Sequence, residues 1–282
     1  MLKEIFVKSK TTLLELIVNE TELGHFQAQK VLRDRHVKIN GKRVGEDQSV
    51  SEKDVVYVYI RDREAKAVEI VFMDKNVAVV NKMAGLEVEG EDSLTERLNE
   101  QLEEGKALPV HRLDRNTMGL VVFALNESTQ KELLTLFKDR EMDKYYYALV
   151  SGNPQKQANL KAFLFKDAKK SEVYISPTQK QGYLPIETNY KFMRKKGELS
   201  LLEVKLITGR THQIRAHLAY EKLPIVGDGK YGVNTINKKY KIKQQALCCY
   251  KLIFHFGEKS PLRYLDNKVV KTDIDLFEMV TF

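Results

Sequence analysis

The residues best suited to chemistry stand together in the segment His111-Arg112-Leu113-Asp114-Arg115. A single carboxylate, that of Asp114, has one histidine and two arginines within three residues of it. Neighbouring arginines keep a carboxylate in its ionised form, which suits a nucleophile or an ion-paired anchor better than a general acid. A solvated charge cluster at the entrance to a strand is the alternative interpretation of this segment.

Two further segments carry side chains that can act beside this carboxylate. The run Lys144-Tyr145-Tyr146-Tyr147 is β-prone, and alternation along a strand places Tyr146 on one face and its two tyrosine neighbours on the other, where we expect core residues. The run Gly209-Arg210-Thr211-His212-Gln213-Ile214-Arg215 predicts the start of a helix with Thr211 as its N-cap. The free amides of a helix start favour an anion, and active sites are commonly assembled at such element ends.

Several familiar catalytic and cofactor-binding patterns are missing from the sequence. It has no HExxH, no cysteine-rich zinc spacing, no Gly-x-Ser-x-Gly elbow, no kinase motifs and no glycine pattern for a phosphate or a dinucleotide. We therefore expect no metal and no cofactor. Cys248 and Cys249 are adjacent, and neighbours rarely meet disulfide geometry, so the sequence predicts two buried, reduced thiols and with them a cytoplasmic location.

The composition predicts a soluble protein with a polyanionic partner. Of the 282 residues, 43% are hydrophobic and 30% are charged, and no apolar run approaches the length that spans a bilayer. The first residues show no secretory signal. A formal net charge of +8 favours nucleic acid as the partner, with an anionic membrane second. Ten lysines and arginines against three acids between Lys156 and Lys196 indicate a segment suited to tracking phosphates.

The elements that must position these residues fall into two predicted domains. Residues 1–60 predict two short helices, a β-hairpin about the Asn40-Gly41 pair and a last strand over Val55–Ile60. Residues 61–67 are polar or small and predict a linker. Residues 68–282 predict a catalytic domain of strands and helices. We expect an α/β fold of the α+β type, with a mixed, mainly antiparallel sheet behind a small helix–hairpin domain.

Four motifs follow one another along residues 68–256 and together resemble the RluA-type pseudouridine synthases. They are His-Arg-Leu-Asp-Arg-x-Thr-x-Gly-Leu, Lys-x-Tyr-x-Ala-Leu-Val, Gly-Arg-Thr-His-Gln-Ile-Arg-x-His-Leu and Pro-Ile-x-Gly-Asp-x-x-Tyr-Gly. The resemblance implies that Asp114 is the catalytic aspartate, that Tyr146 packs on the target base and that Arg215 forms an ion pair with the aspartate. It also implies that Arg112 helps to hold the target nucleotide out of its stack.

Further RNA contacts are expected around this site. Arg210 and Gln213 are expected to face the RNA. Arg115 either binds RNA or supports its own loop, and His212 either contacts a phosphate or simply starts the helix. The sequence leaves both alternatives open.

The first domain resembles the alpha-L RNA-binding motif. The resemblance rests on two short helices that lead into a hairpin with the pattern Val-x-Ile-Asn-Gly-Lys. In that family the second helix and the loop entering the hairpin meet RNA phosphates. The residues implied here are Lys30, Arg33, Arg35, Lys38 and Lys42. A plain helix–hairpin domain with solvated lysines is the alternative.

Three positions depart from the residues usual in the synthase family. Met118 stands where the family usually has serine, Met83 where it has proline, and Cys248-Cys249 where it has His-Ala. Neither methionine position carries chemistry in this interpretation, so we expect effects on local loop shape there. The cysteine pair is expected to alter either pocket packing or RNA contacts. His111 and His217 are expected to be structural histidines.

The resemblance implies isomerisation of uridine to pseudouridine in structured RNA, with ribosomal RNA favoured over transfer RNA and a monomeric enzyme. The reaction breaks the nitrogen–glycosidic bond, turns the base over and rejoins it through carbon 5, without redox change. Asp114 either attacks the anomeric carbon or takes a sugar proton, and Tyr146 is a candidate to assist removal of the carbon-5 proton. The rival functions are a non-catalytic RNA-binding or ribosome-assembly factor and an RNA glycosylase. A buried Asp114–Arg215 pair that only fixes the fold is the structural alternative.

Overall fold

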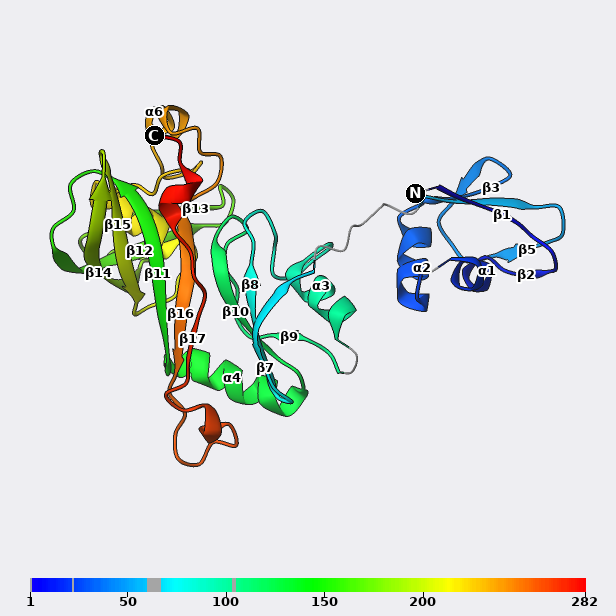
Figure 1. The fold of residues 1–282 in the computed structure, drawn as a ribbon, viewed down its shortest axis with the longest axis horizontal. Coiled ribbons are helices and arrows are strands. Elements are labelled where there is room, and N and C mark those ends of the chain that lie inside the picture. The colour runs from blue at the N-terminus through cyan, green and yellow to red at the C-terminus, as the bar shows by residue number, and fades with distance from the viewer. Residues whose placement is uncertain (1, 22, 60–66, 103–104) are drawn as a thin grey trace. The chain divides into compact units, whose positions relative to one another are not determined.

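The computed structural model describes residues 2–21, 23–59, 67–102 and 105–282 (Figure 1). The chain divides into two compact units, Met1–Lys66 and Ala67–Phe282. The linker predicted at residues 61–67 lies outside the described residues except for Ala67. No helix in the described parts of the chain is long and apolar enough to span a bilayer.

The first unit is a small helix-and-sheet module. Helix α1 (Leu13–Glu20) begins at Thr12, whose hydroxyl accepts the backbone N–H of Glu15, and α2 (His25–Arg33) follows it. Strands β3 (Val37–Ile39) and β4 (Lys42–Val44) form the predicted hairpin, and both Asn40 and Gly41 have the positive φ that a tight two-residue turn requires. The sheet order is β1-β6-β3-β4, with β1 at Leu2–Phe6 and β6 at Val55–Tyr59, while β2 (Thr11–Thr12) pairs with β5 (Ser49–Val50).

The second unit is built on one eleven-stranded sheet, which confirms the predicted fold class. Its order is β13-β12-β14-β15-β11-β16-β10-β8-β7, with β17 beside β16 and β9 beside β10. Among the described strands, β10 and β16 form the one parallel pair. The strands are β7 (Glu69–Met73), β8 (Val77–Lys82), β9 (Leu108–Pro109), β10 (Met118–Ala124), β11 (Met142–Ser151), β12 (Gln157–Asp167), β13 (Glu172–Ser176), β14 (Leu184–Lys196), β15 (Leu199–Leu206), β16 (Leu247–Phe254) and β17 (Val269–Lys271).

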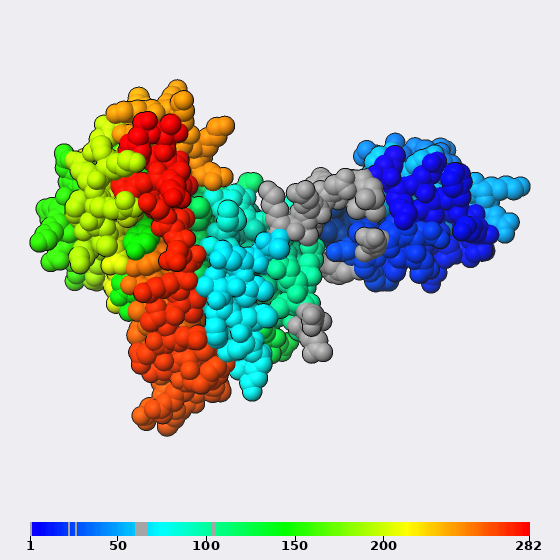
Figure 2. Space-filling view, viewed as in Figure 1, coloured from blue at the N-terminus to red at the C-terminus, as the bar shows by residue number. Residues whose placement is uncertain are grey.

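Helices and the C-terminal segment cover this sheet. Helix α4 (Glu127–Asp139) packs against β9 and β10, and α5 (Gln213–Tyr220) packs against β12, β13 and β14. Helix α3 (Leu94–Gln101) is capped by Ser93, and α6 (Asn234–Lys239) precedes β16. The last residues of the chain, with 3₁₀ turns at Arg263–Leu265 and Leu276–Met279, run as a strip along one face of the unit (Figure 2).

Gly119 allows β10 and β16 to lie close together. Its φ is +105°, and a Cβ added there would lie 2.2 Å from the carbonyl oxygen of Cys249. The parallel register is short, with Met118 opposite Cys248 and Gly119 opposite Cys249. From Gly119 to Ala124, β10 pairs with β8 in antiparallel register. This close approach fixes the strand that directly follows the loop carrying Asp114.

Candidate active site

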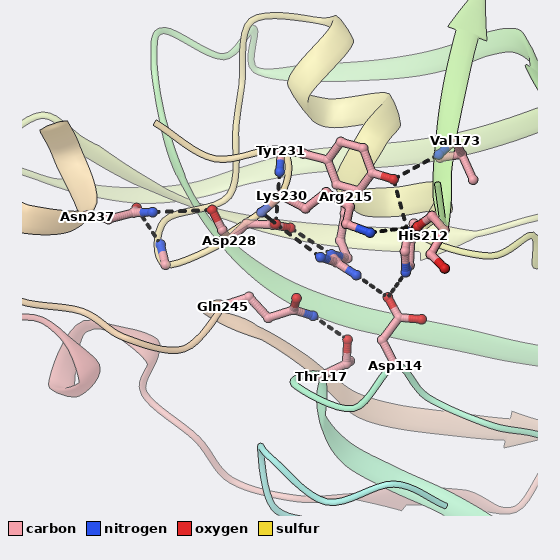
Figure 3. A network of polar contacts seen from close by, with 12 residues as sticks. Asp114, Thr117, Val173, His212, Arg215, Asp228, Lys230, Tyr231, Asn237 and Gln245 are labelled. Carbon is pink, nitrogen blue, oxygen red and sulfur yellow. Dashed lines mark hydrogen bonds and ion pairs between the residues drawn. The ribbon is translucent and has the colours of Figure 1, made fainter. Parts of the chain in front are cut away.

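Asp114 lies in the loop between β9 and β10, and Arg215 reaches it from α5. The Nη1 group of Arg215 donates to Oδ2 of Asp114 at 2.8 Å (Figure 3). The other edge of the same guanidinium binds Asp228, with Nε donating to Oδ2 at 2.7 Å and Nη2 to Oδ1 at 3.1 Å. Asp228 has a fully buried side chain, whereas 25% of the Asp114 side chain is exposed. The buried Asp228 therefore fixes the orientation of the Arg215 guanidinium, which presents one donor to the accessible carboxylate of Asp114.

The charges of this triad stabilise one another. Burial disfavours the charged guanidinium, but the hydrogen bonds and charges of Asp228 and Asp114 outweigh it and raise the pKa of Arg215 above its ordinary value. Burial alone would raise the pKa of Asp228, yet Arg215 and the backbone N–H groups of Tyr231 and Lys230 lower it below the ordinary value. Arg215 and Asp228 therefore stay ionised at neutral pH.

His212, as a neutral ring, lies near the same oxygen of the Asp114 carboxylate that Arg215 binds. The Tyr231 hydroxyl accepts the backbone N–H of Val173 at 3.0 Å and lies 2.9 Å from Nδ1 of His212. The hydroxyl therefore directs its own proton to Nδ1, and we assign the histidine proton to Nε2, which lies 4.0 Å from Oδ2 of Asp114. Burial lowers the pKa of His212, and Arg215 adds to that shift against the opposing charge of Asp114.

A buried lysine ties the Asp114 loop to the neighbouring loop. Lys82 is fully buried, and its ammonium donates to the carbonyl oxygens of Met83, Leu86 and Arg115 at 3.0, 2.7 and 2.9 Å. Burial lowers its pKa to about 8, and the negative charge of Asp114 opposes that shift. The exposed Arg115 side chain donates from Nε to the carbonyl oxygen of Gly85 at 3.1 Å, which favours its loop-supporting role.

Tyr146 lies on β11 with its ring toward the same site. Its side chain belongs to the main core cluster, whereas Tyr145 and Tyr147 pack in the second cluster on the opposite face, as the strand alternation predicted. Burial raises the pKa of Tyr146 well above its ordinary value, and the neighbouring thiol of Cys249 adds to that shift. A protonated phenol is a poor base, which argues against Tyr146 as the group that takes the carbon-5 proton.

A cavity of about 590 Å³ joins these residues, and it lies in the size range of small-molecule sites. A second hollow of about 650 Å³ adjoins it and shares Arg112, Asp114 and Arg210 with it. The predicted residues on the wall of the first cavity are Arg112, Asp114, Tyr146, Arg210, His212, Gln213 and Arg215. The structure thus brings these seven together, while Arg115 lines the second hollow.

The start of α5 differs from the prediction. The prediction of Thr211 as N-cap is wrong, because the helix begins at Gln213 and His212 occupies the N-cap position with a left-handed φ of 53°. Gln213 is buried, and its side-chain oxygen accepts from the Thr208 hydroxyl at 2.8 Å and from the backbone N–H of Arg210 at 3.0 Å. Its amide nitrogen donates to Thr188 Oγ1 and to a backbone carbonyl. The contacts give Gln213 a role in shaping this turn, and its predicted RNA contact stays untested.

The predicted RNA-binding residues of the first unit lie along α2 and the hairpin. Arg33, Arg35 and Lys42 are exposed, and Lys30 is half-buried. Lys38 is also half-buried, with its ammonium 5.2 Å from the centre of the Tyr59 ring. Three of the five cations thus present their charge fully to solvent, and their contact with RNA stays a prediction.

The departures from the family pattern have structural roles. Met118 packs in the second core cluster, Met83 is 68% exposed, and both cysteines are free and buried as predicted. His111 accepts the backbone N–H of Val122 through Nε2 at 2.9 Å, and burial lowers its pKa to about 3, which supports its structural role. In the described residues, no group of three or more His, Cys, Asp or Glu is placed to hold a metal ion.

Three site residues were not singled out by the sequence analysis. Lys82 and Asp228 support the loop and the arginine described above, and Lys144 lines the cavity beside Tyr146. Lys144 and Asp228 stand inside the quoted motifs, in Lys-x-Tyr and Gly-Asp-x-x-Tyr-Gly. Their positions were therefore visible, but a charged residue in a motif gives no sign of whether it meets substrate or another side chain.

Comparisons with known proteins identify the family. Residues 76–220, more than half of the chain, match the family model described as RNA pseudouridylate synthase. The chain belongs to the RNA pseudouridylate synthase family. This synthase is 34% identical over 270 residues to an uncharacterized RNA pseudouridine synthase of Mycoplasma capricolum subsp. capricolum, a match that covers 86% of each chain.

The synthase also resembles ribosomal enzymes and a solved human structure. It is 32% identical over 226 residues to the ribosomal large subunit pseudouridine synthase C of Vibrio cholerae serotype O1, covering 72% of this chain and 70% of that one. Human RNA pseudouridylate synthase domain containing 4 shares the fold, with a TM-score of 0.62 at 24% identity over 76% of this chain and 92% of the human one. These matches confirm the resemblance to RluA-type synthases on which the sequence analysis relied.

Proposed function

We propose that this pseudouridine synthase modifies uridine in structured ribosomal RNA, with Asp114 as the essential catalytic group. The observation that carries the proposal is the Asp114–Arg215 pair on the wall of a cavity that Tyr146 also lines. The relative named as a ribosomal large subunit synthase supports ribosomal RNA over transfer RNA as the substrate.

The carboxylate of Asp114 has one oxygen held and one oxygen free. Arg215 binds Oδ2, and His212 lies nearest to the same oxygen. Among the described residues Oδ1 has no hydrogen-bond partner, so it is the oxygen that meets the sugar. Breaking the nitrogen–glycosidic bond develops positive charge at the anomeric carbon, which a fixed carboxylate stabilises whether it attacks that carbon or takes a sugar proton.

The target base must leave its stack before it reaches Asp114. Unstacking costs a few kcal/mol, and contacts to the flipped nucleotide offset that cost. Tyr146 offers an aromatic ring inside the cavity, and the exposed Arg112 lies where both hollows meet. We assign base packing to Tyr146 and stabilisation of the flipped state to Arg112, with the first unit gripping flanking RNA through its α2 and hairpin cations.

The decisive experiment replaces Asp114 by Asn, which keeps the shape and removes the charge. In-vitro-transcribed large-subunit ribosomal RNA carrying tritium at carbon 5 of uridine serves as substrate, because pseudouridine formation releases that tritium to water. Asp114→Asn is expected to abolish release while RNA binding is retained. Asp139→Asn, at the exposed end of α4, is the matched control and should react like the unaltered enzyme. Tritium release by Asp114→Asn would refute the assigned role.

The same assay separates the rival functions. A non-catalytic RNA-binding factor would bind the transcript and release no tritium, even with Asp114 intact. An RNA glycosylase would leave the tritium on free uracil, which chromatography distinguishes from tritiated water.

A further inference from the structure

Lys144 lies inside the cavity beside the base platform. It precedes Tyr146 by two residues on β11, and both line the same 590 Å³ cavity. A Cβ added to Gly209, another wall residue, would lie 3.7 Å from the Lys144 ammonium, and the centre of the Phe137 ring lies 5.4 Å from it. The ammonium is therefore among the inner wall residues of the cavity, with its side chain half-buried.

Apart from the face of the Phe137 ring, this ammonium has no partner among the described residues. Within the part of the chain that the structure describes, Lys144 makes no hydrogen bond and no ion pair. Two other lysines of this unit have polar partners: Lys82 donates to three carbonyl oxygens, and Lys205 on the adjacent strand β15 pairs with Asp143 at 2.9 Å. Burial lowers the pKa of Lys144, and the nearby charge of Arg140 adds to that shift. A partly desolvated, unpaired cation is costly, so its presence in a binding cavity indicates a negatively charged group on the ligand.

The position of Lys144 favours the base over the phosphates as that group. The cavity has four exposed cations at its wall, which suit phosphates that remain near solvent; these are Arg112, Lys138, Arg140 and Arg210. Lys144 is more buried than these four and lies beside Tyr146, to which we assign the target base. The inference therefore rests on the proposed function.

The reaction creates negative charge on the base. When the bond between nitrogen 1 and the anomeric carbon breaks, both electrons leave with uracil, and the charge spreads over nitrogen 1 and the two carbonyl oxygens. The new bond to carbon 5 forms with an electron pair of the turned base. The proton lost from carbon 5 is balanced by one gained at nitrogen 1, so a lysine that stabilises the detached base keeps its own protons throughout.

We propose that Lys144 is a further catalytic residue, which donates a hydrogen bond to the detached uracil and stabilises its negative charge while the base turns over. A preorganised donor in a cavity that excludes water is effective because it needs no reorganisation when the charge develops. The free ammonium rotates about a flexible side chain, so it can follow either carbonyl oxygen as the ring rotates.

The test compares Lys144→Met with Lys144→Arg and with the control Lys131→Met. Single-turnover tritium release is measured with the enzyme in saturating excess over labelled large-subunit ribosomal RNA, and the Kd for the same RNA is measured separately. Lys144→Met is expected to lower the rate constant by about 10²–10³-fold with the Kd unchanged, as for loss of one donor to a developing anion. Lys144→Arg keeps the charge and should recover part of the rate. Lys131→Met, which removes an exposed cation of α4 outside the cavity, should leave both the Kd and the saturated rate unchanged.

A second measurement concerns the leaving base. RNA containing 5-fluorouridine has a more acidic base, which needs less stabilisation of its negative charge when it leaves. The rate of forming the product with a carbon–carbon glycosidic bond is measured. The loss of this rate in Lys144→Met should therefore be smaller with 5-fluorouridine than with uridine. A defect of equal size with both bases contradicts the proposal. So does a Lys144→Met variant that reaches the unaltered rate at saturation and shows only a raised Kd, because Lys144 would then be a phosphate contact.

These outcomes are separate from failure of the proposed function. If the unaltered enzyme releases no tritium, or Asp114→Asn releases it normally, the proposed function fails. If both behave as proposed and Lys144→Met reacts normally, the inference about Lys144 alone is wrong. Thermal unfolding of each variant shows that the fold is retained, and the partial activity of Lys144→Arg provides the test should Lys144→Met unfold.

Discussion

The guanidinium of Arg215 is shared between two carboxylates, and this sharing determines what it offers to Asp114. Asp228 takes two N–H donors in a buried, fork-like contact, and Asp114 takes one. The buried carboxylate of Asp228 thus compensates most of the positive charge of Arg215. Arg215 orients Asp114 while drawing less electron density from it than an arginine with a single partner would. For the proposed function, this sharing would leave Asp114 reactive toward an electron-poor sugar.

Removing the charge of Asp228 should affect both stability and rate. Asp228→Asn leaves Arg215 without its buried counter-ion, and breaking such a pair costs about 3–5 kcal/mol. The released arginine should also misplace Asp114, lowering the single-turnover rate by about 10²-fold with little change in RNA affinity. Urea unfolding and tritium release measure the two effects.

The matched control uses an exposed ion pair. Arg194 and Asp275 lie 2.7 Å apart with 53% and 39% of their side chains exposed, and such pairs contribute less than about 1 kcal/mol. Asp275→Asn keeps its capping ability at the 3₁₀ turn and should be near neutral in both assays. Equal losses in the two variants would show that Asp228 has no special role.

At the scale of elements, α5 carries a pH-sensitive contact with β14. His217 is fully buried, with Nδ1 3.0 Å from Thr188 Oγ1 and no partner for Nε2. Burial lowers the pKa of His217 to about 4. As the pH falls below about 6.5, the unfolded chain binds a proton that the folded chain does not, so stability decreases toward pH 4, by about 3 kcal/mol in total.

This prediction is tested by unfolding in urea at several pH values between 7 and 4. His217→Gln cannot titrate, so its stability should fall less steeply over this interval than that of the unaltered protein. The difference between the two curves isolates His217 from the other titrating groups. Parallel curves would contradict the assignment.

The approach of β10 to β16 gives a second prediction at this scale. Gly119→Ala places a methyl group 2.2 Å from a backbone oxygen at a φ of +105°. Because backbone cannot yield as a side chain does, we expect the strands to separate, with a loss of more than about 2 kcal/mol and a displaced Asp114 loop. Gly257→Ala, with nothing within 4 Å and no positive φ, is the control and should be neutral. Equal unfolding curves for the two variants would contradict this prediction, because β10 would then accommodate the added methyl group without loss of stability.

The sequence predicted those elements whose determinants are local. The Asn40-Gly41 turn and the face of Tyr146 each depend on a few adjacent residues. The parallel β10–β16 pair joins segments about 130 residues apart, and no local pattern encodes it. The predicted N-cap of α5 was wrong for a related reason. The side chain of Gln213 accepts the backbone N–H of Arg210 and closes a turn before the helix, which residue propensities do not reveal.

For the catalytic centre, the resemblance of motifs supplied what spacing alone did not. Asp114 and Arg215 are 101 residues apart, and their contact is a property of the whole sheet. The second carboxylate on Arg215 was missed because nothing in Gly-Asp-x-x-Tyr-Gly distinguishes a buried counter-ion from an exposed acid.

At the scale of the whole molecule, the proposed RNA contacts divide between two units with different tasks. In the proposed function, the cavity of the second unit selects and reacts with one nucleotide, whereas the cations of α2 and the hairpin hold flanking RNA. Phosphate contacts supply affinity that depends on salt and carry no direct information about sequence. Loss of the first unit's cations should therefore change binding and leave the chemical step unaffected.

Arg33→Gln, Arg35→Gln and Lys42→Gln combined in one variant test this division. All three side chains are exposed, at the end of α2, before β3 and at the start of β4. The variant should bind ribosomal RNA more weakly, with the slope of log Kd against log salt reduced by about 2–3, and should react at the unaltered rate when saturated. Lys3→Gln, Lys8→Gln and Lys10→Gln combined remove the same charge from exposed positions outside α2 and the hairpin. If both variants bind RNA equally weakly, the loss of positive charge in general, and not of an RNA-binding face, accounts for the lower affinity.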